Sequence, residues 1–389
     1  MLMKPKYLAN PIGTVELLAT VLGVDLHALQ KLAEAASGRY HEFEIDKKTG
    51  GKRKITAPDF DLKLVQKRIN RFVFSNVQYP DYLFGGIAEK DYLRNAQVHV
   101  GAKVLIAVDV ESFYPNIKSS TVKKIFQYFC NFSPEVSDVL TRLTTLNGAV
   151  PQGACTSSHL ANLVFHETEH ALVHEFRQKG LKYSRLLDDI TVSSKSELSA
   201  AKIAKNIDRV AAMLKTVNCR IKKSKTKISS ESNPSDLMFV TGLWLNRGRP
   251  RVTSSDRDLI RSEVYNCLKL ASVSRHVSDY HAKHDRVSGR VAKLAYVGHK
   301  EAVVFRRQLS AVLPLFDKND ENKTKILAQV LSRSSAEARS KISYFERFHQ
   351  VMHRANIHVR NNPKFAAEIR GILKRVTPLI SREAAEYGE

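Results

Sequence analysis

The sequence has 389 residues, 43% of them apolar and 26% charged, which is enough to bury a sizeable core in two or three structural units. Its 62 Lys and Arg residues against 39 Asp and Glu residues give a formal net charge of +23, which favours a nucleic-acid partner because a positive surface attracts a phosphate backbone. The N-terminus lacks the apolar run of a signal peptide and no apolar segment is long enough to span a bilayer, so we expect a cytoplasmic protein without a membrane partner. The four cysteines contain no CxxC pair, so we expect neither a disulfide framework nor a zinc ribbon.

The N-terminal region predicts a helical module, a hairpin and a longer helix. Two short helices are expected within residues 14–37, with Gly23 at the break and Asp25 as an N-cap. A helix-turn-helix is one interpretation of this pair, and a small packing module is the commoner one. Strands are expected at 40–45 and 53–56, joined by the turn DKKTGGK, followed by a helix at 59–76.

The middle of the chain alternates between strands and helices. The apolar run VLIAV within residues 103–110 is typical of a buried strand. We expect helices near 119–130 and 135–146, a loop at 148–153 and one long helix from Ser157 to about Gln178. Residues 181–194 predict two strands joined by a tight turn at Asp188 and Asp189, followed by a helix at 199–216 and an extended segment at 219–228. This order predicts an antiparallel sheet backed by helices.

The last third of the chain predicts helices only. Residues 261–270 and a helix beginning at Ser288-Gly289-Arg290 alternate apolar and basic faces. Residues 319–389 carry 13 Lys and Arg against 8 Asp and Glu, a net charge of +5. One apolar stripe in this tail consists of Ile342, Phe345, Phe348, Val351 and Met352.

Three carboxylates form a candidate catalytic set. Asp109 ends the buried strand, and Asp188 and Asp189 lie at the tip of the later hairpin, which can pack beside that strand. Two or three carboxylates suffice to hold two Mg²⁺ ions, which keep some water ligands and can drive phosphoryl transfer to a 3′-hydroxyl. The alternative is that Asp-Asp is a favourable turn dipeptide and Asp109 a strand-end cap. These residues alone do not decide between the two interpretations.

A rival motif suggests zinc chemistry. Residues 166–170, HETEH, match HExxH, in which two histidines four apart on one helix face share a Zn²⁺ ion. The match falls within the predicted long helix, whose apolar face is needed for packing. We therefore expect these residues to form a helix surface, and a zinc metallohydrolase is a remote alternative.

Several motifs in order resemble those of reverse transcriptases. They are VLIAVDVESFYPNI at 104–117, PQG at 151–153 followed by ACTSSHLANL, RLLDDITVS at 185–193 and KSKTKIS at 223–229. More narrowly, Asn95-Ala96-Gln97-Val98-His99 is similar to the NAxxH motif, and Val240-Thr241-Gly242 to the VTG motif, of retron reverse transcriptases. The resemblance runs from about residue 14 to 317 and stops before the tail.

The resemblance implies an α+β fold arranged as a right-hand polymerase, with an antiparallel palm sheet and a helical C-terminal extension. The expected domains are an N-terminal helical module at 1–38, fingers at 39–103, palm with interleaved fingers segments at 104–239, thumb at 240–318 and the extension at 319–389. It also implies roles for individual residues. Metal ligands would be Asp109, Asp188, Asp189 and the Val110 carbonyl, holding two Mg²⁺ ions for which Mn²⁺ can substitute.

The remaining implied roles concern nucleotide and RNA. Tyr114 would be the steric gate against ribonucleotides, with Phe113 in that role if the register shifts by one. The other nucleotide-binding positions would be Lys52, Arg53, Lys54, Gln152, Gly153 and Lys225. RNA-binding positions would be Asn95, His99, Val240, Thr241 and Gly242. Leu186 departs from the family, which usually has an aromatic residue two places before the first hairpin aspartate, so primer grip or fidelity should differ while metal binding stays intact.

The function implied by the resemblance is RNA-directed DNA synthesis on a dedicated structured noncoding RNA, in bacterial antiphage defence. The partners would be that RNA as template and primer, dNTPs, the RNA–DNA hybrid product, and an effector protein or second copy bound through the C-terminal extension. Two alternatives stay open beside the zinc enzyme. A catalytically degenerate RNA-binding scaffold would tolerate loss of Asp109, and a group II intron-like enzyme would require maturase and nuclease domains.

Overall fold

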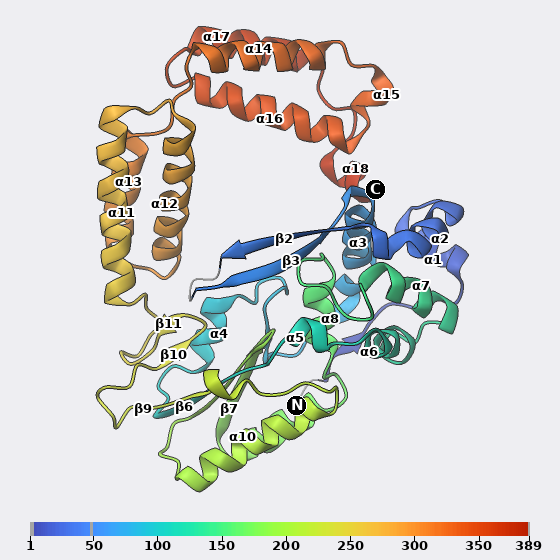
Figure 1. The fold of residues 1–389 in the computed structure, drawn as a ribbon, viewed down its shortest axis with the longest axis vertical. Helices are drawn as coiled ribbons and strands as arrows, with labels where there is room; N and C mark the ends of the chain where they lie inside the picture. The colour runs from blue at the N-terminus through green and yellow to red at the C-terminus, as the bar shows by residue number, and fades with distance from the viewer. Residues whose placement is uncertain (1–3, 47–49, 388–389) are drawn as a thin grey trace. The chain divides into compact units, whose positions relative to one another are not determined.

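A computed structural model describes residues 4–46 and 50–387, and divides the chain into two compact units, Met1–Pro250 and Arg251–Glu389 (Figure 1). Within the described residues, no helix is both long and apolar enough to cross a membrane. The expected turn at 46–52 falls partly on residues 47–49, which lie outside the described residues. Gly50 and Gly51, which follow them, both have positive φ values, 86° and 79°.

The N-terminal helices form a packing module in the first unit. Helix α1 (Val15–Leu22) ends at Gly23, whose φ of 60° is left-handed, and α2 (Leu26–Ala35) begins where the Asp25 carboxylate accepts a hydrogen bond from the Ala28 amide. Both helices pack against α7 (Pro134–Thr144) (Figure 1), and α1 also contacts α3 (Phe60–Phe72). A short antiparallel pair, β1 (Lys6–Tyr7) with β4 (Val77–Gln78), was not predicted.

The early hairpin consists of β2 (Tyr40–Asp46) and β3 (Lys52–Pro58), paired antiparallel from Tyr40 opposite Pro58 to Asp46 opposite Lys52. Its inner end is fixed to the rest of the unit, because the Thr56 amide donates to the Gln152 carbonyl at 2.9 Å. The outer end is exposed to solvent. The hairpin therefore extends from a fixed base beside the loop that contains Pro151-Gln152-Gly153.

A five-stranded sheet forms the centre of the unit in the order β5-β7-β8-β6-β9. Its strands are β5 (Leu83–Phe84), β6 (Val104–Asp109), β7 (Leu181–Leu186), β8 (Asp189–Ser194) and β9 (Lys227–Ser230). The apolar strand β6 lies between β8 and β9 and is antiparallel to both, which confirms the predicted sheet. The short β5 adds one parallel pairing, with β7.

The helices of this unit differ from the prediction at one place. Residues 119–130 form α6 (Ser119–Lys124) and a continuing π-helical turn, Ile125–Phe129, and residues 200–215 form α10 (Ala200–Lys215), as expected. The single helix predicted from 157 to 178 is wrong: α8 (Ser157–Leu163) and α9 (Glu169–Gln178) are separated by turns at 164–168. The carbonyls of Ala161 and Asn162, which a continuous helix would use internally, accept from the Arg185 guanidinium instead. Remaining short elements are α4 (Tyr92–Val98), α5 (Phe113–Asn116), β10 (Phe239–Val240) and β11 (Leu243–Trp244).

The second unit is helical, as expected. Helices α11 (Ser254–Val273), α12 (Ser278–Tyr296) and α13 (Glu301–Ala311) pack on one another, and so do α14 (Lys318–Ser332), α16 (Ile342–His358) and α17 (Pro363–Arg375) (Figure 1). The short helices α15 (Ala336–Arg339) and α18 (Arg382–Tyr387) contact α16. The helix expected to begin at Ser288 is wrong in its start, because α12 begins ten residues earlier and Gly289 lies within it.

The apolar stripe of α16 is shifted from the predicted one. Tyr344, Phe348, Val351 and Ala355 are buried, whereas Phe345 and Met352 are only partly covered. Tyr344 was missed because its ring is usually counted as amphipathic; here its hydroxyl donates to the Val376 carbonyl at 2.5 Å.

Candidate active site

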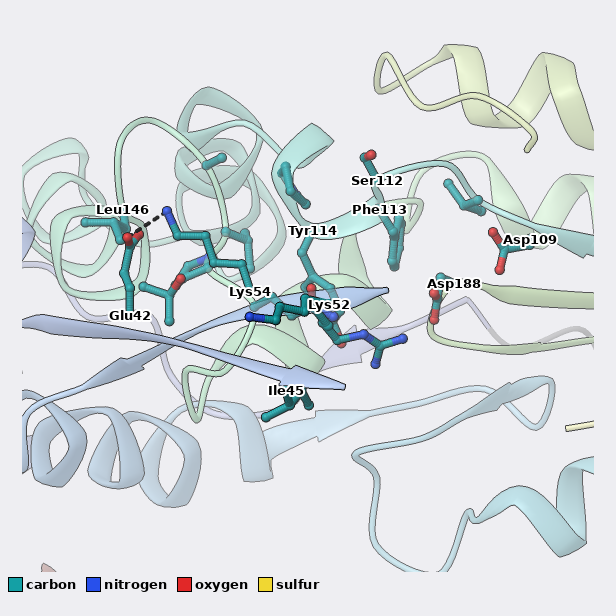
Figure 2. Close-up of a pocket in the computed structure, with 18 of the residues that line it drawn as sticks. Glu42, Ile45, Lys52, Lys54, Asp109, Ser112, Phe113, Tyr114, Leu146 and Asp188 are labelled. Carbon is teal, nitrogen blue, oxygen red and sulfur yellow. Dashed lines mark ion pairs between the residues drawn. The ribbon is translucent and has the colours of Figure 1, made fainter. Parts of the chain in front are cut away.

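The main cavity of the first unit has a volume of about 1040 Å³ and adjoins a smaller one of about 520 Å³. Both are bordered by Asp109, Asp188 and Lys225, and by Arg53, Tyr114 and Gln152. These residues come from six separate segments of the chain. The fold therefore brings most of the predicted catalytic and nucleotide-binding residues together in one place (Figure 2).

Strand pairing places the three carboxylates together where β6 ends and β8 begins. Asp109, the last residue of β6, pairs directly with Asp189, the first residue of β8. Asp188 precedes it in the hairpin turn, and its carbonyl accepts from the Val110 amide at 3.0 Å. The turn itself requires a left-handed residue, Leu187, with φ of 57°. Strand pairing thus sets the spacing of Asp109, Asp188 and Asp189.

The electrostatics around these three carboxylates favour a bound cation. Desolvation by the surrounding protein raises the pKa of Asp188, and the Asp109 charge adds to that rise. The pKa of Asp189 rises to about 6, chiefly from desolvation although part of the side chain reaches solvent, with smaller contributions from Asp188 and Asp109. The Lys225 ammonium donates to the Asp109 carboxylate at 2.9 Å, and this hydrogen bond raises the pKa of Lys225. Clustered carboxylates that repel one another are stabilised by any positive charge placed among them.

The oxygen donors of this cluster fit hard divalent ions, although the protein alone does not supply a complete set of ligands. Among residues 4–46 and 50–387, no group of three or more His, Cys, Asp or Glu side chains is arranged as a ready-made metal site. Mg²⁺ does not need one, because it keeps several waters and takes one or two carboxylates together with substrate phosphates. The Lys225–Asp109 contact is more than half exposed on the lysine side, so a divalent ion can displace it at small cost.

The two neighbouring aromatic rings have different surroundings. Phe113 is buried and its ring stacks on Phe165 with centroids 6.1 Å apart. Tyr114 is half-buried and borders both cavities, and burial followed by the Asp188 charge raises its pKa to about 12. Both rings border the main cavity, and Tyr114 is the one of the two that also borders the smaller cavity, so the role of Tyr114 as the steric gate stays a prediction.

The loop that contains Pro151-Gln152-Gly153 packs closely against β3. Gly153 has φ of 132°, and a Cβ there would lie 2.9 Å from the Thr56 carbonyl oxygen and 2.8 Å from Ile55. Glycine is thus required by packing against β3, in addition to the approach to nucleotide that we expected. Gln152 borders both cavities, as predicted.

The three basic residues on β3 divide between two faces of the strand. Lys52 pairs with Glu44 at 3.0 Å. Lys54 pairs with Glu42 at 2.6 Å (Figure 2). Arg53, which alternation points the other way, borders both cavities, and its charge acts on Asp188 and Tyr114. Figure 2 shows Asp109 and Asp188 at one end of the main cavity and the Glu42–Lys54 pair at the other.

The residues of the NAxxH and VTG motifs lie elsewhere. Asn95, His99 and Val240 are buried, and none of the five motif residues borders either cavity. The His99 ring bonds the hydroxyls of Ser184 and Ser193, each at 2.7 Å, and burial lowers its pKa to about 3. The Thr241 hydroxyl donates to the Tyr92 carbonyl at 2.9 Å, which joins the VTG motif to α4, the helix that contains Asn95.

The HETEH segment does not form a zinc site in the described part of the chain. His166 lies in the turns before α9 and packs edge-on against Phe129, so it does not share a continuous helix with His170. The expectation of a helix surface was wrong for Glu169, whose carboxylate is buried and accepts from Arg185 at 2.6 and 2.8 Å. Sequence reasoning missed this pair, although an arginine within the otherwise uncharged end of a buried strand, YSRLL, was a usable signal.

The comparisons with known proteins agree with the geometry. The family described as reverse transcriptase (RNA-dependent DNA polymerase) matches residues 45–262. The Retron Se72 reverse transcriptase of Salmonella heidelberg (strain 579083-10) is 38% identical, over 84% of this chain and 86% of that protein. The Retron Ec48 reverse transcriptase of Escherichia coli is 34% identical, over 82% of this chain and 80% of that protein.

A solved structure of telomerase from Candida albicans, in complex with the TWJ fragment of telomeric RNA, matches 88% of this chain and 66% of its own, with a TM-score of 0.39 and 10% identity. The chain belongs to the reverse transcriptases, the RNA-dependent DNA polymerases, and among them to the retron type.

Proposed function

We propose that this reverse transcriptase uses Asp109, Asp188 and Asp189 to hold two divalent cations, normally Mg²⁺, and copies a dedicated structured noncoding RNA into DNA. The observation that carries the proposal is the meeting of Asp109 on β6 with Asp188 and Asp189 on the β7–β8 hairpin, in a cavity bordered by basic residues. The noncoding RNA as template is inferred from the relatives, which are named as retron reverse transcriptases.

Each residue around the cavity has a role that its chemistry supports. Bound cations activate a 3′-hydroxyl and neutralise charge on the leaving pyrophosphate. The three carboxylates hold the cations, and the Val110 carbonyl adds an oxygen to that set. Lys225, released from Asp109, lies where an ammonium can bind pyrophosphate, and the Arg53 guanidinium can bind the triphosphate in a bidentate manner.

Selection for deoxyribonucleotides is assigned to Tyr114, because its ring borders the same cavity as Asp109 and Asp188. A ring at the sugar position excludes a 2′-hydroxyl by simple overlap. Asn95, His99 and Val240 are buried, so their contribution to RNA binding is the positioning of exposed neighbours rather than direct contact.

The biological setting is part of the proposal, and the resemblance to retron enzymes and the positive charge support it. The second unit, residues 251–389, carries 26 Lys and Arg against 15 Asp and Glu. This excess of positive charge suits recognition of an RNA through its helical shape and its phosphate groups. We assign the protein to antiphage defence in bacterial cytoplasm, with residues 319–389 as the part that holds an effector protein or a second copy.

The test uses protein purified with its nucleic acid retained. The bound RNA is sequenced, and labelled dNTPs with Mg²⁺ are supplied to wild type and to Asp188→Asn. Wild type should extend DNA on one abundant structured RNA, and Asp188→Asn should be slower by at least about a hundredfold because a cation ligand is lost, while it retains the RNA. Retained RNA with no synthesis by either protein would favour a catalytically degenerate scaffold, with Leu186 as the first position to restore to Tyr.

A further inference from the structure

A fully buried ion pair lies directly behind the catalytic hairpin. The Arg185 and Glu169 side chains are 0% and 2% exposed, and the guanidinium donates to both carboxylate oxygens, at 2.6 and 2.8 Å. The Tyr183 hydroxyl donates to the same carboxylate at 2.7 Å. Burying two charges costs more than burying apolar groups of equal size, so stability alone does not explain this pair.

The remaining hydrogen bonds of Arg185 reach two further segments, the end of α8 and the turn of the hairpin. It donates to the carbonyls of Ala161 at 2.9 Å and Asn162 at 3.0 Å, at the end of α8. It also donates to the Leu187 carbonyl at 3.2 Å. That carbonyl belongs to the peptide that joins Leu187 to Asp188. The guanidinium therefore fixes the orientation of the peptide from which the Asp188 side chain departs.

The peptide needs such a support because Leu187 is left-handed, with φ of 57°, a conformation that costs a non-glycine residue free energy. Gly85 provides a second contact with the hairpin turn. A Cβ on Gly85 would be 3.1 Å from both Leu186 and Leu187, and the Gly85 carbonyl accepts from the Asn162 amide at 2.8 Å. Asn162 thus contacts both supports, one through its carbonyl and one through its side chain.

We propose that the buried Arg185–Glu169 pair is a positioning device that holds the Leu187–Asp188 peptide in the orientation required for divalent-cation binding. Glu169 fixes the position of the Arg185 guanidinium, and the guanidinium fixes the orientation of the Leu187–Asp188 peptide. Glu169, the second glutamate of the HETEH segment, thus influences the geometry of the hairpin. This inference rests on the proposed function of Asp188 as a cation ligand.

The test measures cation binding directly, on the full chain freed of nucleic acid. Mn²⁺ affinity is read by electron paramagnetic resonance for wild type, Asp188→Asn, Arg185→Lys and Glu169→Gln. Arg185→Lys keeps the charge but loses the forked donors, and Glu169→Gln keeps the shape but loses the charge. Both should weaken Mn²⁺ binding by about tenfold or more, as supporting residues of metal ligands do, and raise by a similar factor the Mg²⁺ concentration for half-maximal synthesis. The KM for dNTP at saturating Mg²⁺ should stay within about twofold.

A matched control separates positioning from loss of a buried arginine in general. Arg68 is also buried and donates to the carbonyls of Leu22 and Gly23 in the N-terminal module. Arg68→Met should lower the melting temperature but leave Mn²⁺ affinity unchanged. The double variant Arg185→Met, Glu169→Leu removes both buried charges, so it should recover stability without recovering Mn²⁺ affinity.

The outcomes are distinguishable. Wild-type Mn²⁺ affinity in Arg185→Lys and Glu169→Gln, or recovery of affinity together with stability in the double variant, overturns the positioning role and leaves the proposed function intact. Unchanged Mn²⁺ binding by Asp188→Asn overturns the cation site itself, and the positioning role with it.

Discussion

Two adjacent rings of the short helix α5, Phe113 and Tyr114, both border the main cavity but differ in burial. Phe113 is 3% exposed and stacks on Phe165, whereas Tyr114 lies among polar and charged groups. The sequence alone left the register of these two positions open by one residue. Burial favours Tyr114, because Phe113 is mostly packed in the core and borders only the main cavity, whereas Tyr114 is less buried and borders both cavities.

A substitution at each ring should therefore have a different result. Tyr114→Ala should raise incorporation of ribonucleotides relative to deoxyribonucleotides by about tenfold or more, because the lost discrimination is an overlap of at least about 1.4 kcal/mol. Phe113→Leu should instead lower the free energy of unfolding by about 1–2 kcal/mol, through lost packing, with discrimination unchanged. Competition assays with paired dNTP and rNTP, and urea denaturation, measure the two effects. Loss of discrimination in Phe113→Leu alone would reverse the assignment.

At the scale of elements, the β2–β3 hairpin shows how strand alternation divides a run of like charges. Lys52 and Lys54 are paired across the hairpin with glutamates of β2 and border only the main cavity, whereas Arg53 borders both cavities. The sequence motif KRK presented these three residues as equivalent. Their different faces predict different effects on nucleotide binding.

Arg53→Ala should raise the KM for dNTP by about tenfold or more, since a charge-assisted hydrogen bond to a phosphate contributes about 1.5–3 kcal/mol. Lys54→Ala, which breaks an exposed pair with Glu42, should change KM by less than about threefold. Steady-state kinetics at saturating Mg²⁺ measure both, and Lys54→Ala is the matched control in charge and strand. Equal effects would indicate that the hairpin acts through net charge alone.

Elements were predictable where their signal is local. The buried strand β6 followed from its apolar run, and the helices α1, α2 and α10 from periodicity and N-cap residues. The break between α8 and α9 was not predictable, because its cause is the Arg185 side chain on a strand that follows later in the chain. The two-residue strands β1, β5, β10 and β11 have no periodicity, and only their partners define them.

The candidate site shows the same division. Asp109, Asp188 and Asp189 were candidates from a strand end and a hairpin tip, both local features, and the family resemblance then implied their role as metal ligands. Glu169 was expected on a helix surface, because spacing along the sequence cannot reveal a partner 16 residues away on another element. Buried partners of this kind are set by packing, which a single sequence does not display.

On the scale of the whole molecule, positive charge is spread over both compact units. Residues 251–389 carry a net charge of +11, from 26 Lys and Arg less 15 Asp and Glu, and the remaining 250 residues carry +12. The second unit therefore has the higher charge per residue. Phosphate contacts from both units should add to the salt dependence of RNA binding.

A chain ended after Pro250 should keep its sheet but bind the RNA more weakly and with a shallower salt dependence. Each lost phosphate contact removes about 0.7–0.9 from the slope of log affinity against log salt, so a loss of several contacts is readily measured. Filter binding between roughly 50 and 200 mM salt, with circular dichroism to confirm folding, makes the comparison. Full-length Asp188→Asn is the control that binds normally. An unchanged slope in the shortened chain would confine RNA recognition to residues 1–250.

The central position of β6 has a consequence for biosynthesis. Its neighbours β8 and β9 begin at residues 189 and 227, so both are made well after the strand ends at Asp109. At about 5–20 residues per second, the ribosome needs several seconds to supply the first of them. During that interval VLIAV is an uncharged, proline-free segment of high β propensity, the type that associates with other nascent chains. The yield of soluble enzyme should therefore depend on chaperone shielding of this one strand while the chain is still being translated.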